Sequence, residues 1–279
     1  MKNLIEVSEI EYAYAGGIKA ISNVSFSVSE GERLGILGPN GAGKSTLILL
    51  MAGLLRPNNG WVKVLGKETR SKEFEEVRSS IGVVFQDPDD QLFNNTVFDD
   101  VAYGPRSLGM DECEVEKFVN ETLKLMGIPH LADRPPHHLS YGEKKKVAIA
   151  TALVLKPKIL LLDEPTANLD PRSKNGLLDL LKDLNRGGTT IVLTTHDVEI
   201  LPDIIDRVIL MNRGKILGSG STREMLYEEQ LLGEASMEPP LIVKLFTKLK
   251  TKGLVQKIPL TIDEAEKIID ETLKKSEDG

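Results

Sequence analysis

One glycine-rich segment, residues 38–45, constrains the fold of this chain more than any other feature. It reads GPNGAGKS and matches the pattern G-x-x-x-x-G-K-S. Residues 33–37, just before it, form a short apolar run that predicts a buried strand. Residues 46–55, just after it, have apolar side chains nearly all round and predict a buried helix. A strand, a tight loop and a helix in this order are typical of α/β folds.

The chemistry of segment 38–45 points to a phosphorylated ligand. Its glycines allow positive φ and close approach of the backbone, so successive N–H groups can point at phosphate oxygens. The positive end of the following helix adds to this attraction for an anion. Lys44 can reach the β and γ phosphates of a nucleotide, and Ser45 can ligate Mg²⁺. The segment therefore predicts binding of a nucleoside triphosphate.

Two adjacent carboxylates end a second apolar run. Residues 159–162 predict a buried strand, and Asp163 and Glu164 follow it directly. Ligands of parallel sheets bind at the carboxyl ends of the strands. Because neighbouring side chains of a strand point in opposite directions, Asp163 can hold Mg²⁺ through its water shell while Glu164 acts on an attacking water. The alternative is an acidic strand end that caps the next helix.

Other periodic segments complete an α/β pattern with a mostly parallel sheet. They predict strands at 4–7, 24–28, 81–85 and 190–193 and a helix at 177–184. Residues 87–138 differ, because they hold few β-branched runs and several helix-period segments, and they indicate a helical insert. A further helix is predicted from about residue 144 to 155.

The last part of the chain predicts two amphipathic helices. A break at Pro239-Pro240 precedes apolar residues on one helical face between 241 and 249. Residues 261–264 form a capping box, and apolar residues follow it at helical spacing. We expect these two helices to pack on the main domain or on another subunit.

Composition limits the class of protein. The chain carries 35 Lys and Arg against 42 Asp and Glu, a net charge of -7, which does not favour nucleic acid as a partner. The single cysteine, Cys113, excludes an intramolecular disulfide and fits a reducing compartment. The sequence has no apolar run of the ~18 residues that a membrane span needs and no secretory signal at its start. We therefore expect a soluble, intracellular protein whose membrane role would come from a partner.

Segment 139–143, LSYGE, makes the nucleotide-binding prediction more specific. By itself it would be explained as a helix start capped by Ser140. With segment 38–45 before it and the pair Asp163 and Glu164 after it, it resembles the ATP-binding cassette family over about residues 1–222. The resemblance implies an ATP hydrolase in which two subunits close over two ATP molecules. Each ATP would be held by one phosphate loop and the opposing 139–143 segment.

The resemblance also implies a fold and its divisions. The fold is α/β, a P-loop NTPase of RecA-like type with a mostly parallel sheet, an N-terminal antiparallel β subdomain and a helical signature subdomain. A small C-terminal helical extension follows. The expected ranges are 1–224 for the nucleotide-binding domain, about 87–155 for the helical subdomain within it, and 225–279 for the extension.

Site residues follow from the same resemblance. Those implied in holding ATP are Tyr14, Gly38, Pro39, Asn40, Gly41, Ala42, Gly43, Lys44, Ser45, Thr46, Ser140, Gly142 and Asp163. Tyr14 would stack on adenine, with Tyr12 as the alternative. The catalytic residues would be Glu164, the switch histidine His196 and Gln86, and the Mg²⁺ ligands Ser45, Gln86 and Asp163. Residues 168–170 match the loop that crosses between subunits.

Some residues of this region depart from the pattern or invite other interpretations. The commonest family form is Leu-Ser-Gly-Gly-Gln, and Tyr141 and Glu143 replace its third and fifth residues. The basic triplet 144–146 is interpreted as a solvated helix face rather than a nucleic-acid site. The histidines of the preceding loop are likewise interpreted as solvated rather than metal-binding; they are His130, His137 and His138.

The sequence around Gln86 suggests which cassette group this is. Residues 84–93, 96–101 and 104–105 resemble the energy-coupling-factor group, which serves cobalt, nickel and vitamin uptake, and the C-terminal segments are similar to that group. The resemblance implies an integral membrane partner that contacts residues 86–105, and a position at the cytoplasmic face of the membrane. The working pair would be a homodimer or a heterodimer with a related ATPase.

Three alternatives remain open at the level of sequence. An ATPase of another importer class would share the chemistry, but segment 86–105 argues against it. Non-transport cassette proteins of DNA repair or translation carry long insertions or paired cassettes, whereas about 95 residues separate Lys44 from Leu139 here. A regulatory module that binds ATP without hydrolysis is disfavoured because Glu164 and His196 are both present.

Overall fold

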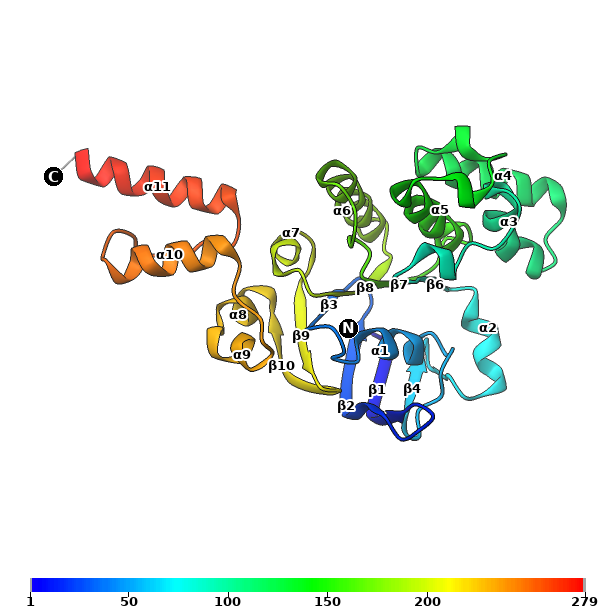
Figure 1. The fold of residues 1–279 in the computed structure, drawn as a ribbon, viewed down its shortest axis with the longest axis horizontal. Coiled ribbons are helices and arrows are strands. Elements are labelled where there is room, and N and C mark those ends of the chain that lie inside the picture. Colours follow the sequence, from blue (N-terminus) through cyan, green and yellow to red (C-terminus); the bar gives the residue numbers. More distant parts are fainter. Residues whose placement is uncertain (1, 278–279) are drawn as a thin grey trace.

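Two β-sheets and the helices that cover them make up the fold (Figure 1). The computed structural model describes residues 2–277. The larger sheet has the strand order β10-β9-β3-β8-β7-β6, and only β10 runs antiparallel to its neighbour. Its strands are β3 (Arg33–Leu37), β6 (Ile81–Val84), β7 (Ile159–Asp163), β8 (Thr190–Thr195), β9 (Arg207–Asn212) and β10 (Lys215–Ser221). This confirms the mostly parallel α/β sheet that the alternating elements predicted.

The smaller sheet is antiparallel, with the order β2-β1-β4-β5. Its strands are β1 (Asn3–Ala13), β2 (Lys19–Ser29), β4 (Asn59–Val64) and β5 (Lys67–Glu68). Both long strands extend well beyond the alternating segments that indicated them. Their period-two pattern buries Ile5, Val7 and Val28 on one face. That face packs against helix α1 (Lys44–Met51) and residues of the larger sheet in one apolar cluster.

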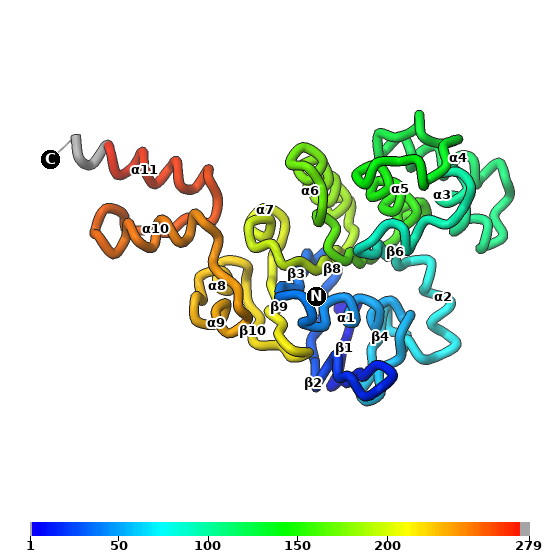
Figure 2. Tube along the Cα trace, in the orientation of Figure 1, coloured from blue at the N-terminus to red at the C-terminus, as the bar shows by residue number. Residues whose placement is uncertain are grey.

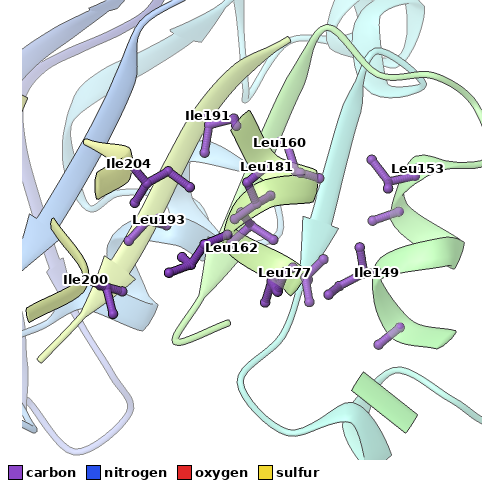
Figure 3. Packing of buried hydrophobic residues seen from close by; sticks show 14 of the residues in the cluster. Ile149, Leu153, Leu160, Leu162, Leu177, Leu181, Ile191, Leu193, Ile200 and Ile204 are labelled. Carbon is purple, nitrogen blue, oxygen red and sulfur yellow. The ribbon is translucent and has the colours of Figure 1, made fainter. Parts of the chain in front are cut away.

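The larger sheet is buried on both faces, which explains why its strands are continuous apolar runs. On one face, Leu161 and Val192 join the cluster around α1. On the other, Leu160 and Leu193 join a second cluster with helices α5 (Tyr141–Leu153) and α6 (Pro171–Arg186). Figure 3 shows this second cluster between the strands and the helices. Successive residues of one strand therefore anchor two opposite helical layers.

The helical insert contains α3 (Val97–Ser107), α4 (Glu112–Leu125) and α5. Each helix begins at a side-chain cap: Thr96, Asp111 and Ser140, respectively. The cap at Ser140 starts α5 at Tyr141, three residues before the predicted start. Helix α6 is also longer than predicted, because Asp170 caps it and Pro171 fits its first position.

The C-terminal segment starts beside the larger sheet, and its last two helices project away from the sheets, as Figures 1 and 2 show. It contains α8 (Thr222–Tyr227), α9 (Glu229–Glu234), α10 (Leu241–Thr251) and α11 (Ile262–Glu277). Helices α10 and α11 pack on each other through Phe246 and Ala265. Arg223 of α8 holds Glu264 of α11 in an ion pair. Val243 of α10 and Leu260, just before α11, join the apolar cluster of the larger sheet, so these helices pack on the main body, which was one of the two predicted arrangements.

The capping box predicted at 261–264 is only half formed. The backbone N–H of Glu264 donates to the Thr261 hydroxyl, but the Glu264 carboxylate accepts from the backbone N–H of Leu260 instead of Thr261. Within residues 2–277, the longest helices are too polar or too short to cross a membrane.

Helix α5 lies so close to strand β6 that Gly82 has no room for a side chain. A Cβ there would be 2.6 Å from the Ala152 carbonyl oxygen and 3.0 Å from Leu160 Cδ1. Gly82→Ala should therefore lower the free energy of unfolding by about 1–3 kcal/mol in urea titrations. Gly176→Ala is the control, because its Cβ would meet nothing within 4 Å in α6, and it should be neutral or stabilise by up to about 1 kcal/mol. Equal stability of the two variants would contradict this close packing.

Candidate active site

The phosphate loop lies at the carboxyl end of β3 and has a shape that only glycine permits at several positions. Gly41 and Gly43 have φ of 79° and 100°, in the left-handed region. A Cβ on Gly43 would lie 2.5 Å from the Ala20 carbonyl oxygen, and one on Gly38 would lie 2.3 Å from that of Met211. Gly38 is also fixed by its N–H, which donates to the Thr195 carbonyl at 3.3 Å. Neighbouring segments therefore hold the loop tightly in place.

A cavity of about 390 Å³ opens over this loop. It brings together most of the residues that the sequence predicted for nucleotide binding. Its lining residues are Tyr14, Ile18, Lys19, Ala20, Asn40, Gly41, Ala42, Gly43, Lys44, Ser45, Thr46, Gln86 and Glu164. The predicted residues come from four separate parts of the chain: the turn after β1, the phosphate loop, the segment after β6 and the end of β7.

Lys44 connects the phosphate loop to the carboxylate at the end of β7. Its ammonium group donates to the carbonyl oxygens of Gly38 at 2.8 Å and Pro39 at 3.2 Å. It also lies 3.1 Å from Glu164 Oε1, and both side chains are about 95% buried, with 6% and 5% of their area exposed. The contact is an ion pair rather than a directed hydrogen bond, because within residues 2–277 Oε1 has no hydrogen-bond partner.

Glu164 is held by strand β8 as well as by Lys44. Its backbone has φ of 45°, and its N–H donates to the Thr194 hydroxyl at 3.0 Å. That hydroxyl donates in turn to Asp163 Oδ1 at 2.5 Å. His196, just beyond β8, places Nδ1 2.9 Å from Glu164 Oε2. Glu164 therefore lies between a lysine and a histidine, with one carboxylate oxygen facing each.

Thr194 is a residue that sequence reasoning missed. It is fully buried and links both carboxyl residues at the end of β7. The only signal for it was its position two residues before His196 at a strand end. Threonine is favoured in strands anyway, so the residue type gave no hint of a site role.

Tyr14 precedes the phosphate loop in the sequence and Gln86 follows it, and both line the cavity over the loop. The Tyr14 hydroxyl is 3.1 Å from the Thr46 hydroxyl, and its ring is 42% exposed at the cavity. The alternative residue, Tyr12, packs against the apolar cluster and makes an edge contact with Tyr14. Gln86 lines the cavity directly after β6.

Six of the predicted residues do not line this cavity, and two of them, Gly38 and Pro39, begin the phosphate loop itself. Ser140 caps α5, and Gly142 lines a different cavity between α5 and α6. Asp163 is buried beneath Glu164, and His196 faces a third cavity shared with Pro39 and Asn40. The chain therefore gathers one set of site residues around its phosphate loop and presents Ser140 and Gly142 elsewhere.

Glu143 gives the altered 139–143 segment a complete capping box. Its carboxylate accepts from the Ser140 N–H at 2.9 Å and from the Ser140 hydroxyl at 2.8 Å. These hydrogen bonds hold the pKa of Glu143 below its usual value. The explanation of this segment as a capped helix start is thus correct locally.

The interpretation of residues 144–146 as a solvated face was wrong for the middle lysine. Lys145 is only 1% exposed, and its ammonium group donates to the carbonyls of Phe85 at 3.1 Å and Gln86 at 2.8 Å. Burial lowers the pKa of Lys145 to about 8, against an opposing attraction from nearby carboxylates that include Asp163. Lys144 pairs with Asp89 at 2.6 Å, so it too is engaged.

The residues at this edge of the sheet fit a magnesium ion with a nucleotide. Glu164 Oε1 is a buried carboxylate oxygen without a hydrogen-bond donor in the described part of the chain, and it faces the phosphate-loop cavity. Ser45 lines the same cavity, and Asp163 lies buried beside it. Oxygen ligands of this kind, with phosphate oxygens, are what Mg²⁺ prefers.

Comparison with solved structures identifies proteins with a similar fold. A structure of cbiO1 from Clostridium perfringens, described as part of the ABC transporter complex cbiONQ, aligns with a TM-score of 0.74. It is 38% identical and covers 90% of this chain and 100% of that one. The dimeric structure of a post-hydrolysis state of the ATP-binding cassette MJ0796, bound to ADP and Pi, aligns with a TM-score of 0.73. It is 31% identical and covers 78% of this chain and 99% of that one.

Comparison of sequences points to the same kind of protein as the comparison of structures. A family model described as ABC transporter matches residues 21–167. The chain therefore belongs to the ABC transporter family, and within it to the ATP-hydrolysing subunits. Among its relatives is the energy-coupling factor transporter ATP-binding protein EcfA of Methanococcus maripaludis, 42% identical over 97% of this chain and 99% of that protein. EcfA of Methanothermobacter thermautotrophicus is 41% identical over 94% of this chain and 85% of that protein.

Removing the Lys44 ammonium group should weaken nucleotide binding. We expect Lys44→Ala to raise the dissociation constant for ATP by about 10-fold or more, since a charge-assisted contact to phosphate contributes roughly 1.5–3 kcal/mol. Isothermal titration of ATP into each protein measures the change. The exposed Lys215 on β10 provides the control variant, Lys215→Ala, which should bind ATP as the unaltered protein does. Unchanged affinity in Lys44→Ala would contradict the assignment.

Proposed function

We propose that this chain is the ATPase subunit of an energy-coupling-factor importer and works as one half of a pair. The observation that carries the catalytic part is the placement of Glu164. Its buried carboxylate lies 3.1 Å from Lys44 and 2.9 Å from His196 at the edge of the phosphate-loop cavity. A carboxylate oxygen that accepts no hydrogen bond in the described part of the chain, and that lies beside a phosphate site, is suited to accept a proton from water.

In the proposed complex, the phosphate loop binds the β and γ phosphates of ATP through its N–H groups and Lys44. The exposed ring of Tyr14 stacks on the adenine. Ser45 and Gln86 hold the magnesium ion directly, and Asp163 holds it through water. These residues would thus place the ion beside the phosphates, where it would supply positive charge against the negative charge that develops there.

Hydrolysis then depends on four side chains, which come from the ends of β7 and β8, the start of α1 and the segment after β6. Glu164 Oε1 polarises the attacking water and receives its proton. His196 orients the carboxylate through Oε2 and faces the γ-phosphate, while Lys44 stabilises the charge on the transferred group. Gln86 completes the position of the water. Because Thr194 fixes the backbone of Glu164, the base is held rigidly before the nucleotide arrives.

The pairing of subunits follows from where Ser140 and Gly142 lie. Both are outside the chain's own nucleotide cavity, at the start of α5. We propose that they contact the γ-phosphate of ATP held by the facing subunit, because a helix start with backbone N–H groups attracts an anion. The cassette MJ0796, which is similar in fold, forms a dimer.

The proposed membrane partner docks near residues 86–105. Phe93 and Tyr103 are largely exposed there and stack edge to face at 5.1 Å. An exposed aromatic pair is a suitable anchor for a partner. The acidic residues of this segment contribute less charge than their number suggests, since Lys144 neutralises Asp89. The protein would thus sit at the cytoplasmic face of a membrane as a peripheral subunit.

The relatives and the neighbouring structure support a transport role of this type. EcfA proteins are named as energy-coupling factor ATP-binding proteins, and cbiO1 is described as part of a transporter complex. We propose uptake of a transition-metal ion such as cobalt or nickel, or of a vitamin. We also propose a division into a nucleotide-binding domain at 1–224, with a helical subdomain at about 87–155, and an extension at 225–279.

Glu164→Gln should stop turnover while it keeps ATP bound between two subunits. A general base contributes about 10²–10⁴-fold to rate, and the amide cannot accept the proton of the attacking water. We expect steady-state ATPase activity to fall by that factor and light scattering to detect an ATP-dependent dimer. Glu116→Gln on exposed α4 is the control. Rapid hydrolysis by Glu164→Gln would remove this residue from its proposed role.

Ser140→Arg should block closure of the pair without affecting ATP binding by single subunits. The arginine is too large for a contact between subunits, and it also removes a helix cap that contributes about 1 kcal/mol. Ser221→Arg is the matched control, because Ser221 and Glu224 form the same capping box at α8, away from the proposed interface. Light scattering in the Glu164→Gln background would detect the dimer. A normal ATP-dependent dimer in Ser140→Arg would argue against the proposed contact between subunits.

A further inference from the structure

Helix α5 is tied to the segment after β6 by side-chain hydrogen bonds that connect two parts of the proposed mechanism. Gln91, in the segment after β6, forms four side-chain hydrogen bonds, two to Val83 and Phe85 and two to α5. Its Oε1 accepts from the N–H of Phe85 at 3.1 Å, and its Nε2 donates to the carbonyl of Ala148 at 2.8 Å and the hydroxyl of Thr151 at 2.7 Å. Gln91 thus attaches the end of β6 to the middle of α5.

Lys145 makes a second attachment, one helical turn closer to Ser140. Its ammonium group donates to two consecutive carbonyls, those of Phe85 and Gln86. The Tyr141 hydroxyl donates to the Gln86 carbonyl as well, at 3.3 Å. The backbone on both sides of Gln86 is therefore fixed from α5, while the Gln86 side chain lines the nucleotide cavity.

A lysine at this buried position has a stability cost. Burying an ammonium group is unfavourable even when carbonyls satisfy it, and burial already lowers the pKa of Lys145 to about 8. A methionine of similar length would fill the same space without that penalty. The donor that the carbonyls of Phe85 and Gln86 lose would offset part of this gain. A buried cation that could be replaced by an apolar residue suggests a role other than stability.

We propose that Lys145 is a positioning residue that makes the Gln86 segment and the Ser140 end of α5 move as one unit. ATP in a chain's own cavity, which Gln86 lines, would then set the position of Ser140 against the ATP of the facing subunit. This inference rests on the proposed function, because it needs two nucleotides between two subunits. It explains how one site could report its occupancy to the other through a single helix.

The test compares Lys145→Met with Lys146→Met, a control on the next residue of the same helix, in the full chain. We expect Lys145→Met to unfold at the same temperature or higher and to keep its affinity for ATP at dilutions where chains are single. We expect its kcat to fall by about 10-fold or more with a smaller change in KM, which indicates loss of a contact needed for turnover. Lys145→Gln, which restores one donor, should recover part of the rate.

Hydrogen exchange tests the same inference without turnover. In single, diluted chains of the Glu164→Gln variant, ATP and Mg²⁺ should slow amide exchange in both residues 85–91 and residues 141–145. Adding Lys145→Met should confine the slowing to 85–91. The proposal would be overturned if exchange slowed in both segments of the double variant. It would also be overturned if exchange in residues 141–145 did not slow in the Glu164→Gln variant. Lys145→Leu, which also lacks a donor, serves in place of Lys145→Met if the latter does not fold.

The two proposals fail in different ways. Absence of ATP hydrolysis by the unaltered protein would contradict the proposed function, while the exchange experiment would still decide whether Lys145 couples the two segments. Normal hydrolysis by the unaltered protein together with full activity of Lys145→Met would overturn the inference alone.

Discussion

The buried contact between Lys44 and Glu164 is the constraint on which the candidate site depends. It joins the loop after β3 to the end of β7, although β8 lies between these strands in the sheet. Both side chains are almost wholly buried, so neither can leave the contact without exposing the other's charge to a poorly solvated environment. The parallel arrangement makes the contact possible, because it brings the carboxyl ends of β3, β7 and β8 to one edge. The phosphate loop, Glu164 and His196 are therefore placed by the same packing that forms the core.

The same packing gives the two helical layers different roles in the proposed mechanism. Alternate residues of β7 anchor α1 on one face and α5 and α6 on the other. Helix α1 begins at the phosphate loop and serves the chain's own nucleotide. Helix α5 begins at Ser140 and, through Lys145, remains attached to the Gln86 segment. The sheet is the fixed part against which these two helices are held.

The sequence predicted the strands and the loop well but not the contacts between distant side chains. The apolar runs before Lys44 and Glu164 are unambiguous, since a strand buried on both faces has no polar positions. The strands β9 and β10 were not individually predicted, and α6 was predicted to be too short because its polar first turns carry little apolar signal. Lys145 was misjudged because three adjacent lysines look alike in sequence, and only the approach of α5 to β6 distinguishes the buried one. Gln91 and Thr194 gave no local signal at all, since their partners are up to 60 residues away.

The capping box at Ser140 affects the strength of the proposed contact between the two subunits. The Ser140 hydroxyl already donates a hydrogen bond to Glu143. The Glu143 carboxylate stays ionised because the hydrogen bonds from Ser140 favour its charged form. A phosphate from the facing subunit would have to compete for that proton and approach a negative charge. Where a glutamine would offer a neutral neighbour, this chain offers a mild repulsion. Such a contact between subunits would separate readily, which suits a pair that must open after each round of ATP hydrolysis.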